Sequence, residues 1–209
     1  MFGVIGKSIA ALGLGGTALV AVAATSFAGP DMSSFARLGA ETSIPYGWID
    51  FCQRYRSECV AAYRIPRAID LTAATFQTIA RINLWVNKNI APIADMEHWG
   101  LLDAWDYPTD GKGDCEDYAL LKRRMLIEEG FPQEALLMTV VKEKNGDGHS
   151  VLTVVTNRGE FVLDNLADQV KPWTKAPYRF VKRQSQTDPN VWVAIGEPTA
   201  APAYVSNRP

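Results

Sequence analysis

The residues best suited to chemistry lie in one short run, Gly-Asp-Cys-Glu-Asp-Tyr at positions 113–118. Cys115 stands between two acids and begins an apolar-periodic segment that predicts a helix. A cysteine at a helix N-terminus lies at the positive end of the helix dipole, which favours the nucleophilic thiolate. Asp114 and Glu116 act in the opposite direction unless a cation neutralises them. Two interpretations remain open: a nucleophile with a base and a cation nearby, or a buried structural cysteine behind an Asp114 N-cap.

The chain has two histidines that could act as the base for Cys115, namely His98 and His149. His149 follows a glycine-containing turn and begins a strand-like run, where a side chain can be held firmly beside a cleft. His98 lies in a tryptophan-bearing loop, where a solvated or packing role is expected. A lone histidine on a strand is usually structural. Because it accompanies a free thiol, His149 is nevertheless the candidate general base.

Asp164 is the candidate for orienting the imidazole, because hairpin register can place it beside His149. If a two-residue loop joins strands at 149–156 and 160–165, Asp164 lies on the same face as His149 and diagonal to it. A three-residue loop would place it on the opposite face. Asp164 also ends an otherwise apolar strand, so its burial would require a partner. These residues predict a triad with Cys115 as nucleophile, His149 as base and Asp164 as the group that holds the imidazole tautomer.

The N-terminus has the composition of a secretory signal peptide. Lys7 precedes an apolar run from Ile9 to Ala24, and Ser26-Phe27-Ala28 has the small-x-small form of a cleavage site. No acidic residue occurs before Asp31. We therefore expect residues 1–28 to direct Sec-type export to the periplasm and to be removed. The alternative is an uncleaved inner-membrane anchor, because the apolar run is nearly long enough to span a bilayer.

Export affects how the three cysteines are interpreted. In an oxidising compartment we expect a disulfide between Cys52 and Cys59 and a free thiol at Cys115. The alternative is two separate buried thiols at the first two positions. Seven positions along a straight helix would separate the two Cα atoms by about 10 Å, too far for a disulfide. The pairing therefore predicts that residues 51–60 do not form one continuous helix.

The remainder of the chain predicts a single α+β domain. With 209 residues and 47% hydrophobic content, the chain can bury one substantial core. Apolar spacing predicts helices over 72–89 and 115–129, the second ending at a glycine followed by proline. Strand-like runs occupy 135–143, 149–156, 160–165, 178–184 and 191–195.

The domain boundaries follow from composition. Residues 29–50 are expected to be irregular and exposed, 51–197 to form the catalytic domain, and 198–209, which are rich in alanine and proline, to be disordered. The net charge of −2 provides no electrostatic case for nucleic acid as a partner. The basic run at 122–124 is expected to be a solvated helix face.

Several motifs occur together in an order and spacing typical of one family. They are Asp-Ala-Trp-Asp-Tyr-Pro at 103–108, the run at 113–118, Gly-His-Ser-Val-Leu at 148–152 and Leu-Asp-Asn-Leu at 163–166. With these motifs the chain resembles the bacterial transglutaminase-like cysteine peptidases, which include the LapG-type periplasmic proteases. The resemblance covers about residues 45–195. It implies a papain/transglutaminase-like fold in which the helix carrying the cysteine packs on an antiparallel sheet carrying the histidine and the aspartate.

The resemblance also implies functional roles for residues of this chain. The family's Cys-His-Asp triad corresponds to Cys115, His149 and Asp164. A calcium ion is implied beside the active site, with Asp114 and Glu116 as its ligands, because hard oxygen atoms are the ligands that Ca²⁺ prefers. Characterised members clip large adhesins near their N-termini and so free cells from biofilm.

From the residues and the resemblance together, we expect an exported, calcium-dependent cysteine endopeptidase. It should act as a monomer on a periplasmic or cell-surface protein. An adhesin is the candidate substrate, and an inner-membrane protein is the candidate regulator. Two alternatives remain: transglutaminase-type acyl transfer to an amine through the same acyl-enzyme, and a non-catalytic calcium-dependent binding protein of the same fold. The intact set of cysteine, histidine and aspartate argues against the second alternative.

Overall fold

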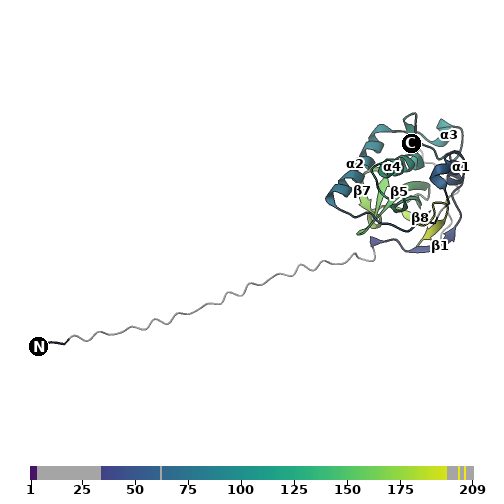
Figure 1. The fold of residues 1–209 in the computed structure, drawn as a ribbon. Coiled ribbons are helices and arrows are strands. Elements are labelled where there is room, and N and C mark those ends of the chain that lie inside the picture. The colour runs from purple at the N-terminus through teal and green to yellow at the C-terminus, as the bar shows by residue number, and fades with distance from the viewer. Residues whose placement is uncertain (4–33, 62, 197–201, 203–204, 206–209) are drawn as a thin grey trace.

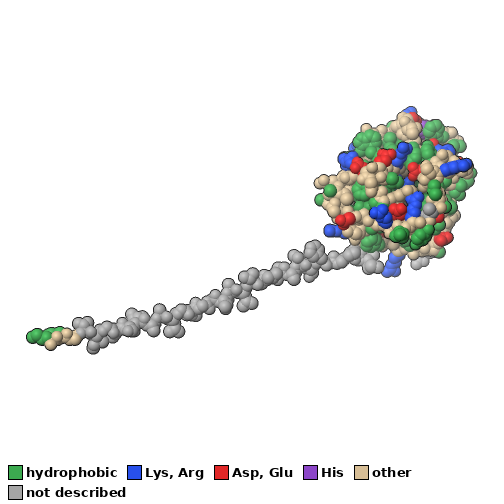
Figure 2. Space-filling model, in the orientation of Figure 1, with side chains coloured by type: hydrophobic (Ala, Val, Ile, Leu, Met, Phe, Trp, Pro, Cys, Tyr) green, Lys and Arg blue, Asp and Glu red, His purple; other side chains and the backbone are tan. Residues whose placement is uncertain are grey.

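The computed structural model describes residues 1–3, 34–61, 63–196, 202 and 205. They form a mixed α+β domain in which helices pack on an antiparallel sheet (Figure 1). Apart from its first three residues, the predicted signal peptide at 1–28 lies outside the described residues. Within the described ranges, no helix combines the length and the apolar character needed to cross a lipid bilayer. On the face shown in Figure 2, basic and acidic side chains are interspersed among uncharged ones.

The main sheet has seven strands. In spatial order they are β1 (Leu38–Thr42), β9 (Trp192–Ile195), β8 (Arg179–Gln184), β4 (Leu136–Lys142), β5 (Gly148–Thr156), β6 (Gly159–Asp164) and β7 (Ala167–Pro172). Every neighbouring pair is antiparallel. Strands β4, β5 and β6 are buried along most of their length, in keeping with their valine, leucine and threonine content. A separate parallel pairing joins β2 (Ala91–Pro92) to β3 (Lys112–Gly113).

The helices are α1 (Tyr46–Arg54), α2 (Ala73–Asn89), α3 (Asp95–His98) and α4 (Cys115–Glu128), with 3-10 turns η2 (Arg56–Cys59), η3 (Gln133–Ala135) and η4 (Trp173–Lys175). Figure 1 shows α2 beside α4, and α4 packs across β5 at the centre of the sheet. The first turn of α4 is buried on all sides. The end of this helix that carries the cysteine is therefore part of the core.

Local sequence explains where α4 ends. Gly130 adopts a φ of +89°, a conformation that favours glycine. Its N–H bonds to the Ile127 carbonyl, and the Phe131 N–H bonds to the Leu126 carbonyl. This is a Schellman motif, which satisfies the last carbonyl groups of the helix. The two predicted helices and the five predicted strands are confirmed, with boundaries that differ by one or two residues.

The expectation that residues 29–50 are irregular and exposed is wrong for much of the described part. β1 forms one edge of the sheet, and α1 begins at Tyr46. Trp48 is fully buried and stacks on Phe51, with ring centroids 5.3 Å apart. The prolines and glycines of this segment suggested a loop. Aromatic packing overrides these local preferences, and an edge strand pairs on one side only and so has a weak sequence pattern. The polar edge strand β7 was missed for the same reason.

The predicted disordered tail, 198–209, is described at Pro202 and Val205 alone. Val205 is 3% exposed and belongs to the main hydrophobic core. The prediction of disorder is therefore wrong at that position. An alanine- and proline-rich composition does not reveal one residue that packs into the folded domain.

The predicted disulfide is present. Cys52 in α1 is bonded to Cys59 in η2, with Cα atoms 5.6 Å apart. α1 ends at Arg54 and η2 begins at Arg56, so residues 51–60 do not form one continuous helix, as predicted. Among the described residues, Cys115 is the free cysteine.

Loss of the disulfide should lower the melting temperature without dismantling the domain. Closing so short a loop contributes about 2–3 kcal/mol. The segment is also held by an ion pair of 3.0 Å between Glu58 of η2 and Arg123 of α4. Thermal melting of the Cys52→Ala/Cys59→Ala variant measures this effect. Mass mapping of the native protein without reductant should find these two cysteines joined, and a bridge to Cys115 would contradict the assignment.

The basic run at 122–124 is not a solvated face. Lys122 and Arg123 are 0% and 1% exposed, and only Arg124 is exposed as predicted. Lys122 Nζ lies 5.8 Å from the Tyr118 ring centroid, and no described atom accepts a hydrogen bond from it. Burial lowers the pKa of Lys122 to about 7, although the negative charges of two nearby aspartates oppose the shift.

Lys122→Met should therefore raise the free energy of unfolding near pH 7, and the gain should shrink as the pH rises. Between the folded pKa of about 7 and the unfolded value near 10.5, the unfolded wild type binds a proton that the folded chain lacks. The free energy of unfolding of the wild type, relative to that of Lys122→Met, thus increases with pH in that window by up to about 1.4 kcal/mol per pH unit. Urea unfolding at several pH values tests this, with exposed Lys144→Met as the matched control. A stability difference that is independent of pH would contradict a lowered pKa.

Candidate active site

Cys115 is the first residue of α4, and the residues around it are tightly constrained. Asp114 is the N-cap, and its backbone N–H donates to Asp117 Oδ2 at 3.3 Å. A Cβ at Gly113 would lie 2.5 Å from that same carboxylate oxygen, so only glycine fits there. The glycine and the two acids of the run thus place the sulfur at the positive end of the helix.

The sulfur of Cys115 is enclosed, with 1% of the residue exposed. Sγ lies 3.1 Å from Glu116 Oε2 and 2.6 Å from the Val205 carbonyl oxygen, and its single S–H can donate to either of them. The backbone N–H of Ser150 donates to it. Burial, followed by the negative charge of Asp114, raises the pKa of the Cys115 thiol well above its ordinary value, despite these opposing contacts. In the absence of a cation, this environment favours the thiol over the thiolate.

His149 and Asp164 form a buried pair. His149 Nε2 lies 3.0 Å from Asp164 Oδ1, and the histidine is 0% exposed. The β5–β6 register pairs Thr156 with Gly159, which confirms the two-residue loop and the shared face. Burial alone would raise the pKa of Asp164, but hydrogen bonding and the charge of His149 lower it overall. The carboxylate is therefore ionised and holds one ring nitrogen of the imidazole.

Tyr178 is a member of this group that was not predicted from the sequence. Its hydroxyl donates to Asp164 Oδ2 at 2.5 Å, and its ring centroid lies 5.1 Å from that of His149. Tyr178 directly precedes β8, so it reaches the pair from a distant part of the chain. Hairpin register could not reveal it, because β8 lies beside β4 rather than beside β6.

The structure brings the cysteine to the strand that carries the histidine. Ser150 directly follows His149, and its N–H bonds to the Cys115 sulfur. The thiol therefore lies at the start of β5, where α4 packs on the sheet. His98, the other histidine, instead contacts Asp110 at 2.9 Å and stacks on Trp99. Cys115 of α4 thus lies beside the start of β5, the strand on which His149 contacts Asp164 of β6.

Five carboxylates converge beside the thiol, and they come from Asp95, Asp103, Asp114, Glu116 and Asp117. Together with the Cys115 sulfur they form overlapping groups of three whose ligand atoms lie within 4.8 Å of one another. All except Asp103 are buried. Asp95 and Asp103 were not identified from the sequence, because they lie in a segment without sustained periodicity.

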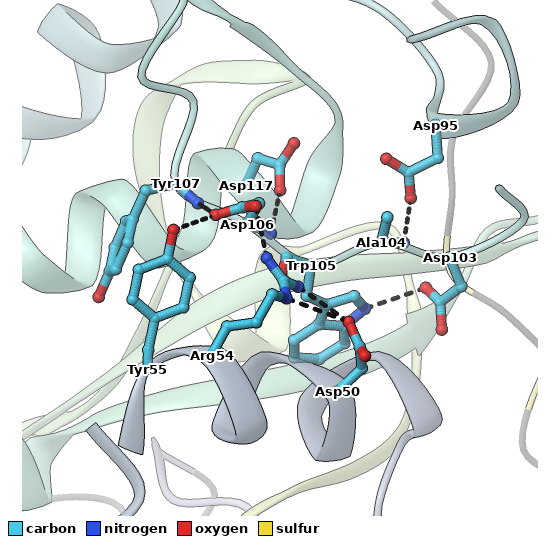
Figure 3. Close-up of polar contacts among 10 residues, drawn as sticks. All are labelled: Asp50, Arg54, Tyr55, Asp95, Asp103, Ala104, Trp105, Asp106, Tyr107 and Asp117. Atoms are coloured by element: carbon cyan, nitrogen blue, oxygen red, sulfur yellow. Dashed lines mark hydrogen bonds and ion pairs between the residues drawn. The ribbon is translucent and has the colours of Figure 1, made fainter. Parts of the chain in front are cut away.

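Two of these acids also hold the loop at 103–107. Asp95 accepts a hydrogen bond from the Ala104 N–H, and Asp117 accepts one from the Asp106 N–H at 2.8 Å (Figure 3). Arg54 of α1 supports the loop from the other side, donating to the Trp105 carbonyl at 2.7 Å. The loop that precedes the cysteine is thus anchored to α1, α3 and α4.

The acidic cluster has the properties of a candidate divalent-cation site. Burial, with added repulsion from neighbouring charges, raises the pKa of Glu116 and Asp117 well above their ordinary values. Burial likewise raises the pKa of Asp95 and Asp103. Glu116 Oε1 is buried and accepts no hydrogen bond from any described group. A cation would compensate both the repulsion and this unsatisfied oxygen.

A family model described as bacterial transglutaminase-like cysteine proteinase matches residues 38–200. The chain belongs to this family. It is accordingly a cysteine peptidase, and the resemblance stated from its motifs is confirmed. No curated protein matches the chain by sequence.

Three solved structures of LapG from Legionella pneumophila resemble this chain to different degrees. Calcium-bound LapG of Legionella pneumophila matches with a TM-score of 0.50 and 21% identity, over 63% of this chain and 76% of that chain. Another LapG structure matches with a TM-score of 0.47 and 24% identity, over 57% and 69% of the two chains. EGTA-treated LapG of Legionella pneumophila matches with a TM-score of 0.46 and 21% identity, over 59% of this chain and 72% of that chain. The predicted transglutaminase-like peptidase fold is thus confirmed.

Proposed function

We propose that this cysteine peptidase is an exported, calcium-dependent endopeptidase that cleaves a periplasmic or cell-surface protein through Cys115, His149 and Asp164. The contact of 3.0 Å between His149 Nε2 and Asp164 Oδ1 is the observation that carries the proposal. It holds the imidazole at the strand end where the Ser150 N–H meets the cysteine sulfur. This arrangement supports the roles of nucleophile, base and orienting acid for the three residues.

In this mechanism the Cys115 thiolate attacks a peptide carbonyl of the substrate. His149 takes up the thiol proton and delivers it to the leaving amine, which gives an acyl-enzyme. Water, activated by the same imidazole, then releases the acid product. Asp164 fixes the tautomer with its contact to Nε2, so Nδ1 is the nitrogen that exchanges the proton. The Cys115 backbone N–H, at the start of α4, serves as one oxyanion donor.

Calcium fits the acidic cluster chemically. Asp114 and Glu116 would hold it, with Asp117 as a minor candidate, and the unsatisfied Glu116 Oε1 supports this choice. The structural relative LapG of Legionella pneumophila is calcium-bound in one of its structures. When bound, the cation would offset the negative field that opposes thiolate formation and would fix the loop before Cys115.

The proposed export to the periplasm is supported by the sequence, and the proposed substrate is supported by the family. The composition of residues 1–28 supports export to the periplasm. A cysteine peptidase acts on a protein substrate, and an adhesin at the cell surface is the candidate that the resemblance favours. An inner-membrane protein is the corresponding candidate regulator, and we propose a monomeric enzyme.

Comparative analysis of protein termini tests this function. Periplasmic and cell-surface proteins from wild type and from a Cys115→Ala strain should differ by a small set of new N-termini that only the wild type generates. Peptide-bond hydrolysis creates such termini, whereas acyl transfer to amines creates cross-linked peptides instead. Identical sets of termini in the two strains would contradict a peptidase acting in that compartment.

A further inference from the structure

Val205 contacts the reactive sulfur from far along the chain. Its carbonyl oxygen lies 2.6 Å from Cys115 Sγ, across a separation of 90 positions. Its backbone N–H faces the Asp103 carboxylate and partly offsets the burial that raises the pKa of this acid. The residue is 3% exposed and packs in the same hydrophobic core as Cys115. The carbonyl, the N–H and the side chain of Val205 are therefore all engaged at the site.

These contacts place a peptide group of the chain itself over the sulfur. A substrate must bring a carbonyl carbon to Cys115 Sγ, so it needs the space that the Val205 carbonyl oxygen occupies. The Val205 carbonyl oxygen faces Cys115 Sγ, and its N–H faces the Asp103 carboxylate. Asp103 is itself positioned by the Trp105 indole N–H at 2.9 Å and by the Gly47 backbone N–H. Neighbouring groups thus hold the Asp103 carboxylate in place beside the Val205 N–H.

We propose that Val205 occupies the space over the Cys115 sulfur that a substrate peptide must enter, so that this residue competes with protein substrates for the cleft. This inference rests on the proposed peptidase function. It explains why the nucleophile is 1% exposed although a protein substrate must reach it. The side chain that fills this space is a buried valine, so the cleft accepts an apolar residue beside the sulfur.

Alkylation of Cys115 in the full-length protein tests the proposal without requiring turnover. Val205→Asp would place a second carboxylate beside Asp103, and the cost of burying two adjacent acids should expel the residue from the cleft. The reaction is run in EGTA so that no divalent cation holds the new carboxylate. Iodoacetamide should then label Cys115 at least roughly tenfold faster than in wild type, because the state in which residue 205 has left the cleft becomes the populated one.

Matched variants separate displacement from general destabilisation. Val205→Ile keeps an apolar side chain and should label at the wild-type rate. Val60→Asp introduces the same charge at a residue that is 53% exposed, and it should also behave as wild type. Val205→Gly, which keeps the backbone and removes only the side chain, should label at an intermediate rate. Melting temperatures recorded for each variant verify that the domain is folded.

A peptide added in trans provides the second measurement. Ala-Tyr-Val-Ser-Asn, the sequence at 203–207, should slow labelling of the Val205→Asp protein, whereas the same peptide with aspartate in place of valine should not. Equal labelling of wild type and Val205→Asp, or no protection by the peptide, would overturn the occupancy. If labelling behaves as expected but neither the wild type nor any variant cleaves protein, occupancy of the cleft by Val205 stands and the proposed peptidase function fails.

Discussion

Cys115→Ala and His149→Ala should each abolish turnover while leaving the domain folded. The first removes the nucleophile, and the second removes the group that takes its proton, so neither can be replaced by a neighbour. Asp164→Asn should lower kcat on the order of 10³–10⁴-fold, because an amide no longer selects the productive imidazole tautomer. Steady-state kinetics on a protein substrate, with melting temperatures as the fold check, measure these effects.

His98→Ala is the matched control for the loss of an imidazole. That histidine contacts Asp110 outside the triad, so the variant should retain wild-type kinetics. Tyr178→Phe removes only the hydrogen bond to Asp164 and should reduce kcat far less than Asp164→Asn. Full activity in Cys115→Ser would refute a thiolate mechanism, because a serine hydroxyl lacks the nucleophilicity of the thiolate in this environment.

Chelation of calcium should abolish turnover reversibly. Without a cation, burial and neighbouring acids raise the pKa of the Cys115 thiol, so little thiolate is present at neutral pH. Bound calcium should offset this field and lower that pKa. The alkylation rate in EGTA should therefore rise only at high pH, and added calcium should shift the whole profile to lower pH. Asp114→Ala and Glu116→Gln should resemble the EGTA-treated enzyme in the presence of calcium.

The competing expectation is a purely structural role for these acids. If Asp114 were a simple helix cap beside a solvated Glu116, Asp114→Ala would cost only about 1 kcal/mol of stability and chelation would change nothing. The burial of Glu116 already argues against a solvated role. Undiminished turnover in excess EGTA would decide in favour of the structural role.

Local sequence patterns predicted the parts of the site that lie close together in the chain. Hairpin register was enough to place Asp164 beside His149, because a two-residue loop determines which face each side chain takes. The short spacing of Cys52 and Cys59 was enough to predict a break in the helix. The first prediction needs only the alternation of side chains along paired strands, and the second needs only the Cα separation that a disulfide allows.

The contacts that were missed join segments far apart in sequence. Asp95 and Asp103 reach the acids of α4 through an irregular segment, and Tyr178 reaches Asp164 from the strand on the far side of β4. Burial of Lys122 was missed for a related reason. A charged side chain normally indicates solvent, and only the packing of α4 between α2 and the sheet places this one in the core.

The position of the disulfide has a consequence for how the nucleophile survives oxidation. Under the proposed export, the chain would meet oxidants before it is folded, and a third thiol would then compete for pairing. Cys52 and Cys59 are seven positions apart, whereas a bond from Cys59 to Cys115 would close a loop about eight times as long (115 − 59 = 56). This is roughly three doublings of loop length, and each doubling adds about 0.6 kcal/mol to the entropic cost of closing the loop. Chain entropy alone therefore directs the first bond to the nearby pair. The short loop leaves the nucleophile without a disulfide partner in its own chain by the time α4 encloses it.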